Sequence, residues 1–397
     1  MQEKNFILFD DECRDQLLPF TFTRPVCEIR IGILTIAGKW ERSLNLRPSY
    51  LTQDYLSKKY QLNKKALNWL INGSVLPDPR LVAQVVSLQP NEAIVENEMV
   101  VACCVADFSM ENGILNSDKI IQQCNVISPA TFIRSVRKLT DIFSMNGEAL
   151  RDDFKLITRQ RRSVTVSESN NISHRDAIFI EEGAIVEYAY LNASQGPIYI
   201  GKNAEVMEGA MIRGPFSLGE GSVVKMGSKI YYPTTIGPFC KVGGEINNVV
   251  MFGNSNKAHD GYLGNAVIGE WCNLGADTNN SNLKNDYSNV KLWNYPQQKF
   301  ADTGLQFCGV MMGDHSKCGI NTMFNTGTVV GVFANLFGDG FPRNFIPSFS
   351  WGGHAGITDY KLEKALKVAE LVMKRREQTL TDVDAEILQH IYNLPKR

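Results

Sequence analysis

Residues 200–242 read I-GKNAEV-MEGAMI-RGPFSL-GEGSVV-KMGSKI-YYPTTI-GPFCKV. Every sixth residue is apolar from Ile200 to Val242, and glycine directly follows four of these residues. A period of six fits neither an isolated strand nor a helix, whose side-chain periods are 2 and 3.6. It is typical of hexapeptide repeats, in which each short strand points one aliphatic side chain inward before the chain turns a corner. This stretch therefore predicts a parallel β-helix.

The same frame continues towards the C-terminus. It returns at Ile268 and Leu274, and again from Met312. We therefore expect repeats over 178–346. Residues 277–307 break the frame with asparagines, a tryptophan and a proline, so they should leave the β-helix as one long loop.

The rest of the chain divides into three predicted parts. Residues 1–162 show a mixture of helical and strand sequence patterns, without a six-residue frame, and start with a predicted buried strand at Phe6–Phe9. The polar stretch 163–177 is the predicted linker. Because the ends of a stack of coils need covers, the amphipathic spacing within 347–397 predicts a helical cap, with a capping box at Thr381 and Asp384. Finer predictions are partial helix over 51–69, paired strands over 92–105, a helix over 130–153 with a stop at Asn146-Gly147, and helices over 358–376 and 381–392.

Composition excludes several classes of partner. The formal net charge of −1 lacks the basic excess that nucleic acid or an anionic membrane surface would need. No apolar run is long enough to span a bilayer, so we expect no membrane association and a cytoplasmic location. Nine cysteines in apolar contexts, without a metal-binding spacing, are expected to be reduced and buried.

One polar run, NKAHDGYLGN at 256–265, stands directly before the frame resumes at Ile268. It places His259 at a break between coils. Histidine can accept a proton near neutral pH, as the attack of an amine on a thioester requires. The other interpretation is a loop histidine that hydrogen bonds to the backbone.

Residues 256–278 resemble the acetyltransferase domain of the bifunctional N-acetylglucosamine-1-phosphate uridyltransferase/glucosamine-1-phosphate acetyltransferases. That family has an acceptor-site histidine, then Tyr-Leu-Gly, then Gly-Ala-Gly-Thr followed by an asparagine. The matching residues here are His259, Tyr262-Leu263-Gly264, Gly275-Ala276-Asp277-Thr278 and Asn282. The resemblance covers about 218–335 and implies a left-handed β-helix.

This resemblance assigns roles to residues of the β-helix. It makes His259 the general base that deprotonates the sugar amine, and Glu245 the carboxylate that orients it. The turn between the two is shorter than in the family, and Asn247 stands where the family has a phosphate-binding lysine. An exposed coil corner is the other interpretation for Glu245 and for Lys225. The substrate contacts that the resemblance implies are Lys225, Tyr262, Asn273 and Asn282, and Ala276 corresponds to a backbone contact near the acyl-CoA thioester.

The N-terminal part resembles the same class, and more closely a bacterial branch of sugar nucleotidyltransferases. The shared run includes Asp10-Asp11, Leu17 to Pro25 and Lys39-Trp40-Glu41. The family's glycine-rich loop is missing, and its metal-binding aspartate has no carboxylate counterpart in 72–77. The resemblance assigns nucleotide binding to Arg14, Arg24 and Lys39, and metal binding to Asn146.

The resemblance implies a sugar-1-phosphate nucleotidyltransferase coupled to CoA-dependent N-acetylation of an amino-sugar phosphate, as in UDP-N-acetylglucosamine synthesis for the cell envelope. A nucleoside triphosphate, a sugar 1-phosphate and acetyl-CoA would be the substrates, Mg²⁺ the cofactor, and a homotrimer the assembly. One alternative is nucleotidyl transfer alone, with the β-helix serving oligomerisation or regulation. Another is a non-catalytic protein that binds nucleotide sugars.

Overall fold

The computed structural model describes residues 4–111 and 113–395 and divides into two compact units. The first unit comprises the chain up to Ile29, Leu34–Leu139 and Thr381–His390. The second comprises Arg30–Ile33, Thr140–Leu380 and the chain from Ile391. Residues 140–162, which the sequence assigns to the N-terminal domain, thus group with the β-helix.

The first unit contains a six-stranded mixed sheet in the order β2-β1-β3-β5-β4-β8. The central strand β1 is parallel to both of its neighbours, β2 and β3. The chain visits these neighbours on opposite sides, so the carboxyl ends of β1 and β3 flank a topological switch point, where open α/β sheets bind ligands. The strands are β1 (Phe6–Phe9), β2 (Ser49–Leu51), β3 (Asn68–Asn72), β4 (Glu92–Glu96), β5 (Met99–Val105) and β8 (Asn125–Ile127), with a separate hairpin of β6 (Met110–Glu111) and β7 (Ile114–Leu115). The α-helices are α1 (Ile36–Leu44), α2 (Pro79–Ser87) and α3 (Ser117–Gln123), and short 3-10 helices are η1 (Glu12–Leu17), η2 (Phe20–Phe22), η3 (Val26–Glu28) and η4 (Asp54–Leu56).

Two predictions for this unit are confirmed and a third holds only in small part. The buried strand at Phe6–Phe9 and the pairing of β4 with β5 are as expected. Within 51–69, the predicted partial helix amounts to the short 3-10 helix η4 alone. Its second half is polar and largely exposed, so a helix there would have no apolar face to bury.

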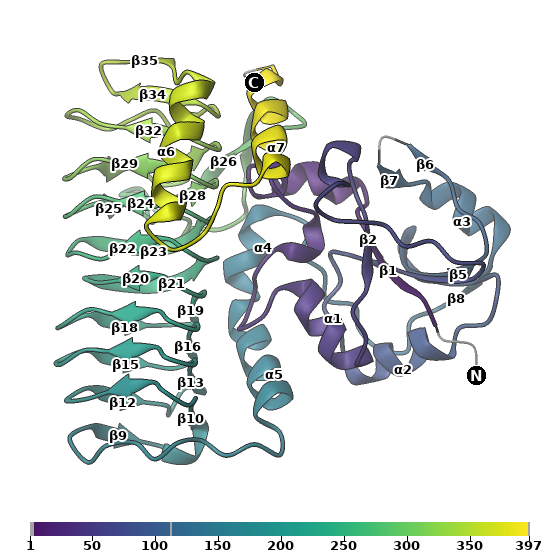
Figure 1. The fold of residues 1–397 in the computed structure, drawn as a ribbon, viewed down its shortest axis with the longest axis horizontal. Coiled ribbons are helices and arrows are strands. Elements are labelled where there is room, and N and C mark those ends of the chain that lie inside the picture. The colour runs from purple at the N-terminus through teal and green to yellow at the C-terminus, as the bar shows by residue number, and fades with distance from the viewer. Residues whose placement is uncertain (1–3, 112, 396–397) are drawn as a thin grey trace. The chain divides into compact units, whose positions relative to one another are not determined.

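The second unit is a parallel β-helix whose coils stack on one another (Figure 1). Most coils contribute one strand to each of three sides, and equivalent residues pair from coil to coil, as Leu218 does with Ile236. The first side holds β10 (Ile178–Ile180), β13 (Ile198–Ile200), β16 (Phe216–Leu218), β19 (Thr234–Ile236), the second halves of β21 (Glu245–Met251) and β23 (Tyr262–Ile268), β28 (Met311–Met312), β31 (Val329–Val330) and β33 (Phe345–Ile346). The second side holds β11 (Ile185–Val186), β14 (Glu205–Val206), β17 (Val223–Val224), β20 (Lys241–Val242), β22 (Asn256–Lys257), β24 (Asn273–Leu274), β29 (Lys317–Cys318), β32 (Asn335–Leu336) and β34 (Ser350–Gly353), to which β35 (Gly356–Asp359) adds as an antiparallel strand. The third side holds β9 (Asn171–Ser173), β12 (Tyr190–Asn192), β15 (Met211–Arg213), β18 (Lys229–Tyr231) and the first halves of β21 and β23, and β25 (Asn279–Asn280) pairs with β30 (Met323–Phe324).

The predicted column of aliphatic side chains fills the interior of the β-helix. Its members are almost completely buried, including Ile200, Leu218, Ile236 and Ile268. Burial of one such side chain stabilises the folded state by about 1.5–3 kcal/mol. The fold class that the sequence predicts is therefore confirmed.

The coils extend further than the apolar frame indicates. On the third side, β9 begins within the stretch 163–177 that the sequence predicts as a linker. The expectation of one loop over 277–307 also needs correction, because β25 still pairs with β30. Asn280 takes the buried position in β25, and its amide donates to the Gly264 carbonyl at 2.9 Å and accepts from the Gly264 N–H at 2.7 Å. The chain leaves the β-helix after β25 and forms a hairpin of β26 (Lys291–Asn294) and β27 (Lys299–Asp302).

Helices accompany two sides of the β-helix within the second unit. After α4 (Leu139–Ser144), α5 (Asn146–Thr158) contacts β19 on the first side, and the predicted stop at Asn146 is instead the start of this helix. Helix α6 (Leu362–Lys374) lies beside the second side (Figure 1). Arg376, which follows this helix, donates to Asn256 Oδ1 at 2.8 Å. This helix starts later than predicted because β35 occupies Gly356–Asp359.

The predicted cap residues at the start of α7 (Asp382–Asn393) are confirmed, since Asp384 N–H donates to Thr381 Oγ1 at 3.1 Å. The short 3-10 helix η5 (Arg175–Ala177) connects β9 to β10. In the part of the chain that the structure describes, no helix combines the length and the apolar character needed to cross a membrane.

Candidate functional site

His259 lies in a tight exposed loop between β22 on the second side and β23 on the third. The loop rests on Gly243 and Gly244 of the preceding coil. A Cβ atom added at Gly243 would lie 2.5 Å from the Ala258 carbonyl oxygen, and one at Gly244 would lie 2.6 Å from the Gly261 carbonyl oxygen. Because neither glycine has a side chain, the loop can pack directly against the backbone of the preceding coil. Among residues 4–111 and 113–395, the His259 imidazole has no hydrogen-bond or ion-pair partner.

A buried lysine supports this loop from inside the β-helix. Lys257 occupies an inward position of β22, paired with Val242 of the previous coil, and is 0% exposed. Its Nζ donates to the carbonyl oxygens of His259 and Asp260, both at 2.6 Å. Burial lowers the pKa of Lys257 to about 8, although the nearby carboxylates oppose this shift. The six-residue frame does not identify Lys257, because this residue is out of register both with Val242 before it and with Ile268 after it.

We expect the substitution Lys257→Met to loosen the loop while the coils remain stacked. The variant keeps an unbranched side chain of similar length but leaves the His259 carbonyl without this donor. Amide hydrogen–deuterium exchange of residues 258–261 should accelerate at least about tenfold, because local opening becomes less costly. Lys241→Met, at an exposed outward position of β20 on the same side, is the matched control. Unchanged exchange in Lys257→Met would contradict a supporting role for this side chain.

Glu245 belongs to a polar cluster on the third side. It pairs with Lys229 on the coil before and with Tyr262 on the coil after. Its carboxylate accepts a hydrogen bond from the Tyr231 hydroxyl and lies 3.9 Å from Lys229 Nζ. Burial, and next the hydrogen bond to Glu245, raise the pKa of Tyr231 to about 12. Within the described residues, Glu245 does not hydrogen bond to His259, so the predicted orienting contact is absent from this structure.

Tyr262 and Asn282, two of the predicted substrate contacts, lie together in the structure. Asn282 Nδ2 donates to the Tyr262 hydroxyl at 2.9 Å and to Asn265 Oδ1 at 2.7 Å. Asn247 also lies near both tyrosines, where its side chain opposes the rise in the pKa of Tyr231 and of Tyr262. Burial raises the pKa of Tyr262, and the hydrogen bond from Asn282 opposes that shift. The site thus presents hydroxyl, amide and carboxylate groups of the kind that bind sugar hydroxyls.

The other predicted residues of the β-helix lie at separate positions. Lys225 is a half-exposed residue at a corner between the second and third sides, two coils before His259. Asn273 faces outward on the second side, where its Oδ1 accepts from Asn256 Nδ2 at 3.3 Å. Ala276 lies at the corner stacked above the His259 loop, and its carbonyl accepts from the Asn321 N–H at 2.8 Å.

The first unit carries a second polar cluster, at the carboxyl ends of β1 and β3. Asp11 Oδ1 accepts from the Cys13 N–H at 2.9 Å, and Oδ2 accepts from Asn72 Nδ2 at 2.9 Å and from Arg137 at 2.8 Å. Burial alone would raise the pKa of Asp11, but Arg137 and these hydrogen bonds outweigh it and hold the pKa below its usual value. The Arg137 side chain is 40% exposed, so it can still meet a ligand. Sequence reasoning did not single out Arg137, which lies far from Asp11 along the chain.

The three cations predicted to bind nucleotide are at most 5% exposed. Arg14 donates to the Thr21 carbonyl at 2.8 Å and to the Tyr55 hydroxyl at 2.6 Å, and it pairs with Asp15. Arg24 and Lys39 also have partners within the protein. These three side chains are therefore enclosed by the protein, and Arg137 is the more accessible cation beside Asp11.

Asp10, next to Asp11, is a buried acid with a shifted pKa. It accepts from the Val26 N–H at 2.8 Å and from the Thr52 hydroxyl at 2.6 Å. Burial raises its pKa to about 6, although Arg14 and these hydrogen bonds oppose the shift. Between the unfolded value of about 4 and this value, the folded state binds a proton that the unfolded state lacks, so stability falls as pH rises.

The substitution Asp10→Asn should therefore stabilise the first unit at pH 7.5. An asparagine can accept from Val26 and donate to Thr52 without carrying a buried charge. We expect a gain of roughly 2–3 kcal/mol at pH 7.5 that disappears below about pH 4, measured by urea unfolding at both pH values. Asp107→Asn, at an exposed carboxylate, should leave the free energy of unfolding nearly unchanged. A variant less stable than wild type at pH 7.5 would contradict this account.

The residues present do not form a preformed site for Mg²⁺. Asn146 is completely buried, and its Oδ1 accepts from the Gly32 N–H and the Thr235 hydroxyl while its Nδ2 donates to the Pro233 carbonyl. Both oxygens of Asp11 already accept hydrogen bonds. The described residues contain no group of three or more histidine, cysteine, aspartate or glutamate side chains that could hold a metal ion. All nine cysteines are free thiols, and eight of them are buried.

Comparisons with known proteins find similarity over part of the chain. Residues 6–162 match the family model described as sugar nucleotidyl transferase. The chain is 34% identical over 87 residues to the Bifunctional protein GlmU of Methanocaldococcus jannaschii, covering 22% of this chain and 21% of that protein. It is 30% identical over 145 residues to the Bifunctional sugar-1-phosphate nucleotidylyltransferase/acetyltransferase of Sulfurisphaera tokodaii, covering 36% of each. The matched regions thus span well under half the length of these relatives. An Arabidopsis UDP-N-acetylglucosamine acyltransferase structure aligns with 54% of this chain and 80% of its own, at 14% identity and a TM-score of 0.26.

Proposed function

We propose that this protein is a transferase with two sites. In the first unit a sugar 1-phosphate is joined to a nucleotide, and in the β-helix an acetyl group passes from acetyl-CoA to the amine of an amino sugar. The observation that carries the proposal is the exposed His259, on a loop held by buried Lys257 beside the cluster of Glu245, Tyr262 and Asn282. One relative, whose name includes both activities, supports the pairing of the two reactions in one chain.

Acyl transfer requires a base at the amine. The amine nitrogen attacks the thioester carbonyl carbon, the carbon–sulfur bond breaks, and the departing sulfur leaves as CoA thiol. The nitrogen loses one proton, which His259 accepts and then passes to the departing thiolate. General-base assistance of this kind accelerates such reactions by typically 10²–10⁴-fold. Tyr262, Asn282 and Asn247 can meanwhile hold hydroxyl or phosphate oxygens of the acceptor.

Nucleotidyl transfer places different demands on the first unit. An oxygen of the sugar phosphate attacks the α-phosphorus of the nucleoside triphosphate, and pyrophosphate leaves as the bond between the α-phosphorus and the bridging oxygen breaks. Such reactions depend mainly on positioning and charge neutralisation. Arg137, half exposed at the carboxyl ends of β1 and β3, can supply positive charge there. Because no described donor set fits Mg²⁺, we assign no step to the metal through these residues.

We further propose that the assembly is a homotrimer, in which acetyl-CoA binds between neighbouring β-helices, and that the product serves cell-envelope synthesis. Exposed apolar side chains on the β-helix, such as Ile185 and Met226, are consistent with contacts between copies. Multi-angle light scattering of the purified chain tests the trimer directly.

The assay that tests the proposal follows two products separately. Purified protein is incubated with glucosamine 1-phosphate, acetyl-CoA, UTP and Mg²⁺, and each substrate is omitted in turn. We expect free thiol and pyrophosphate both to appear. Pyrophosphate alone, tested also with N-acetylglucosamine 1-phosphate, would leave nucleotidyl transfer as the function and the β-helix as an oligomerisation or regulatory element. The absence of both, across other sugar phosphates and nucleotides, would contradict a catalytic role.

A further inference from the structure

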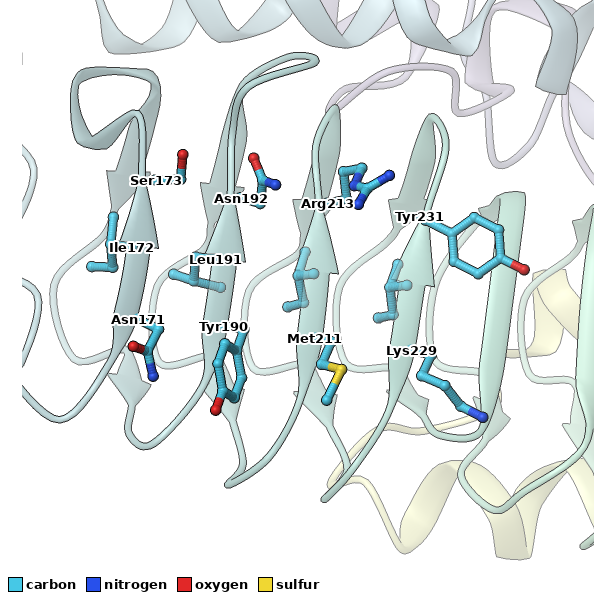
Figure 2. Close-up of a pocket in the computed structure, with 12 residues that line it drawn as sticks. Asn171, Ile172, Ser173, Tyr190, Leu191, Asn192, Met211, Arg213, Lys229 and Tyr231 are labelled. Atoms are coloured by element: carbon cyan, nitrogen blue, oxygen red, sulfur yellow. The ribbon is translucent and has the colours of Figure 1, made fainter.

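A groove of about 920 Å³ runs along the third side of the β-helix, over β9, β12, β15 and β18 (Figure 2). Two rows of outward side chains border it, while the residues between them point into the core. Tyr190, Met211 and Lys229 lie in one row, and Asn192, Arg213 and Tyr231 lie in the other. Tyr190 and Met211 are about half exposed, at 50% and 53%.

The chemistry of this groove suits an anionic ligand with a planar ring. Arg213 and Lys229 lie on adjacent coils in opposite rows. Within the described residues Arg213 has no ion pair or hydrogen-bond partner, and Lys229 has only the distant contact with Glu245. None of the residues that line the groove is acidic. A guanidinium matches the oxygens of a phosphate, and an exposed tyrosine ring can stack on a nucleobase.

The groove leads directly into the proposed acceptor site. Lys229 pairs with Glu245, which pairs with Tyr262, so one row continues into the polar cluster. Tyr231 in the other row pairs with Asn247. Neighbouring strands lie roughly 4.8 Å apart, so Tyr190 on β12 is roughly 19 Å from Tyr262 on β23. This distance is longer than a single sugar ring with one phosphate requires.

We propose, resting on the acyl transfer proposed above, that the acceptor is a nucleotide-activated amino sugar. Its amine lies at His259, its diphosphate between Lys229 and Arg213, and its base against Tyr190. The acyl transfer has the same stoichiometry as before. The amine and the acyl thioester give an amide and CoA thiol, and His259 carries the proton from nitrogen to sulfur. Nucleotidyl transfer must then precede N-acylation, so the product of the first site is the acceptor of the second.

The test compares two acceptors with the full-length protein. The specificity constant for CoA release is measured with UDP-glucosamine and with glucosamine 1-phosphate. We expect UDP-glucosamine to be the better acceptor by at least tenfold. Arg213→Ala should lower the specificity constant for UDP-glucosamine by about 10- to 100-fold and change that for glucosamine 1-phosphate much less, because charge-assisted hydrogen bonds to phosphate are lost. Tyr190→Ala should act in the same direction, and Lys202→Ala, at an exposed lysine outside the groove, should change neither value.

Three results would overturn this inference. Equal or better turnover of glucosamine 1-phosphate would refute the nucleotide-sugar acceptor and leave the proposed acyl transfer standing. CoA release with neither acceptor would remove the acyl transfer itself. A change in molar mass by light scattering in Arg213→Ala or Tyr190→Ala, with unchanged kinetics, would identify the groove as an interface between copies of the chain.

Discussion

The substitution His259→Gln is expected to lower CoA release at least 100-fold while pyrophosphate release stays within about twofold of wild type. Glutamine is polar and fits an exposed loop, but it cannot accept the proton that the attacking amine loses. The expected size follows from the usual contribution of a general base, 10²–10⁴-fold. The imidazole has no partner within the described chain, so its removal should leave the coil intact. Thiol and pyrophosphate are measured on the same preparation.

The matched control for this substitution is His354→Gln. His354 is also exposed, but it hydrogen bonds to the Phe341 carbonyl near the C-terminal end of the β-helix, away from the polar cluster. Both products should be unaffected in this variant. If His259→Gln retained more than about a tenth of wild-type CoA release, another group would have to take the proton, and His259 would be a loop residue without a role in proton transfer.

The second large effect is expected from Gly237→Ala, which should prevent stable folding of the β-helix. A Cβ atom at this position would lie 1.6 Å from the Phe252 carbonyl oxygen and 2.5 Å from the Phe252 carbonyl carbon. Both are backbone atoms, and the surrounding coils are joined by hydrogen bonds from Gly237 N–H to Met251 and from Phe252 N–H to Ile268. Relief of the clash must therefore separate two coils. We expect a loss of about 3 kcal/mol or more.

Gly319→Ala is the matched control because Gly319 occupies the same place in the repeat, directly after an inward residue. The nearest atom to its added Cβ would be 3.7 Å away, which is ordinary contact. Urea unfolding followed by far-ultraviolet circular dichroism should therefore separate the two alanine variants clearly. Equal midpoints for the two would mean that the backbone at Phe252 yields more easily than the coil stacking indicates.

The sequence predicts the β-helix well because its signal is carried by repetition. Each inward position, such as Leu218 or Ile236, is determined by the same requirement in every coil, namely to fill one continuous column. Departures from that requirement are harder to interpret. Lys257 and Asn280 keep inward positions by bonding to backbone atoms of the loop or coil beside them, and such partners are known only once the chain is folded.

The candidate sites were predicted unevenly for a related reason. A resemblance transfers residue types, so it identified Tyr262 and Asn282, which the structure joins by a hydrogen bond. It does not transfer burial or side-chain direction. Arg14 is buried against Thr21 and Tyr55, and Glu245 accepts a hydrogen bond from Tyr231 rather than from His259. The pairing of Asp11 with Arg137 depends on the sheet topology, which brings distant segments together.

The hairpin between β25 and β28 shows how this architecture can acquire new specificity. Ile268 and Met312 remain paired although the whole excursion lies between them along the chain. The cost of closing a loop grows slowly with its length, by only about 0.6 kcal/mol for each doubling. A coil corner can therefore gain or lose residues without altering the stacking on either side. Related proteins could diverge in acceptor preference through insertions at such corners while inheriting the same coils.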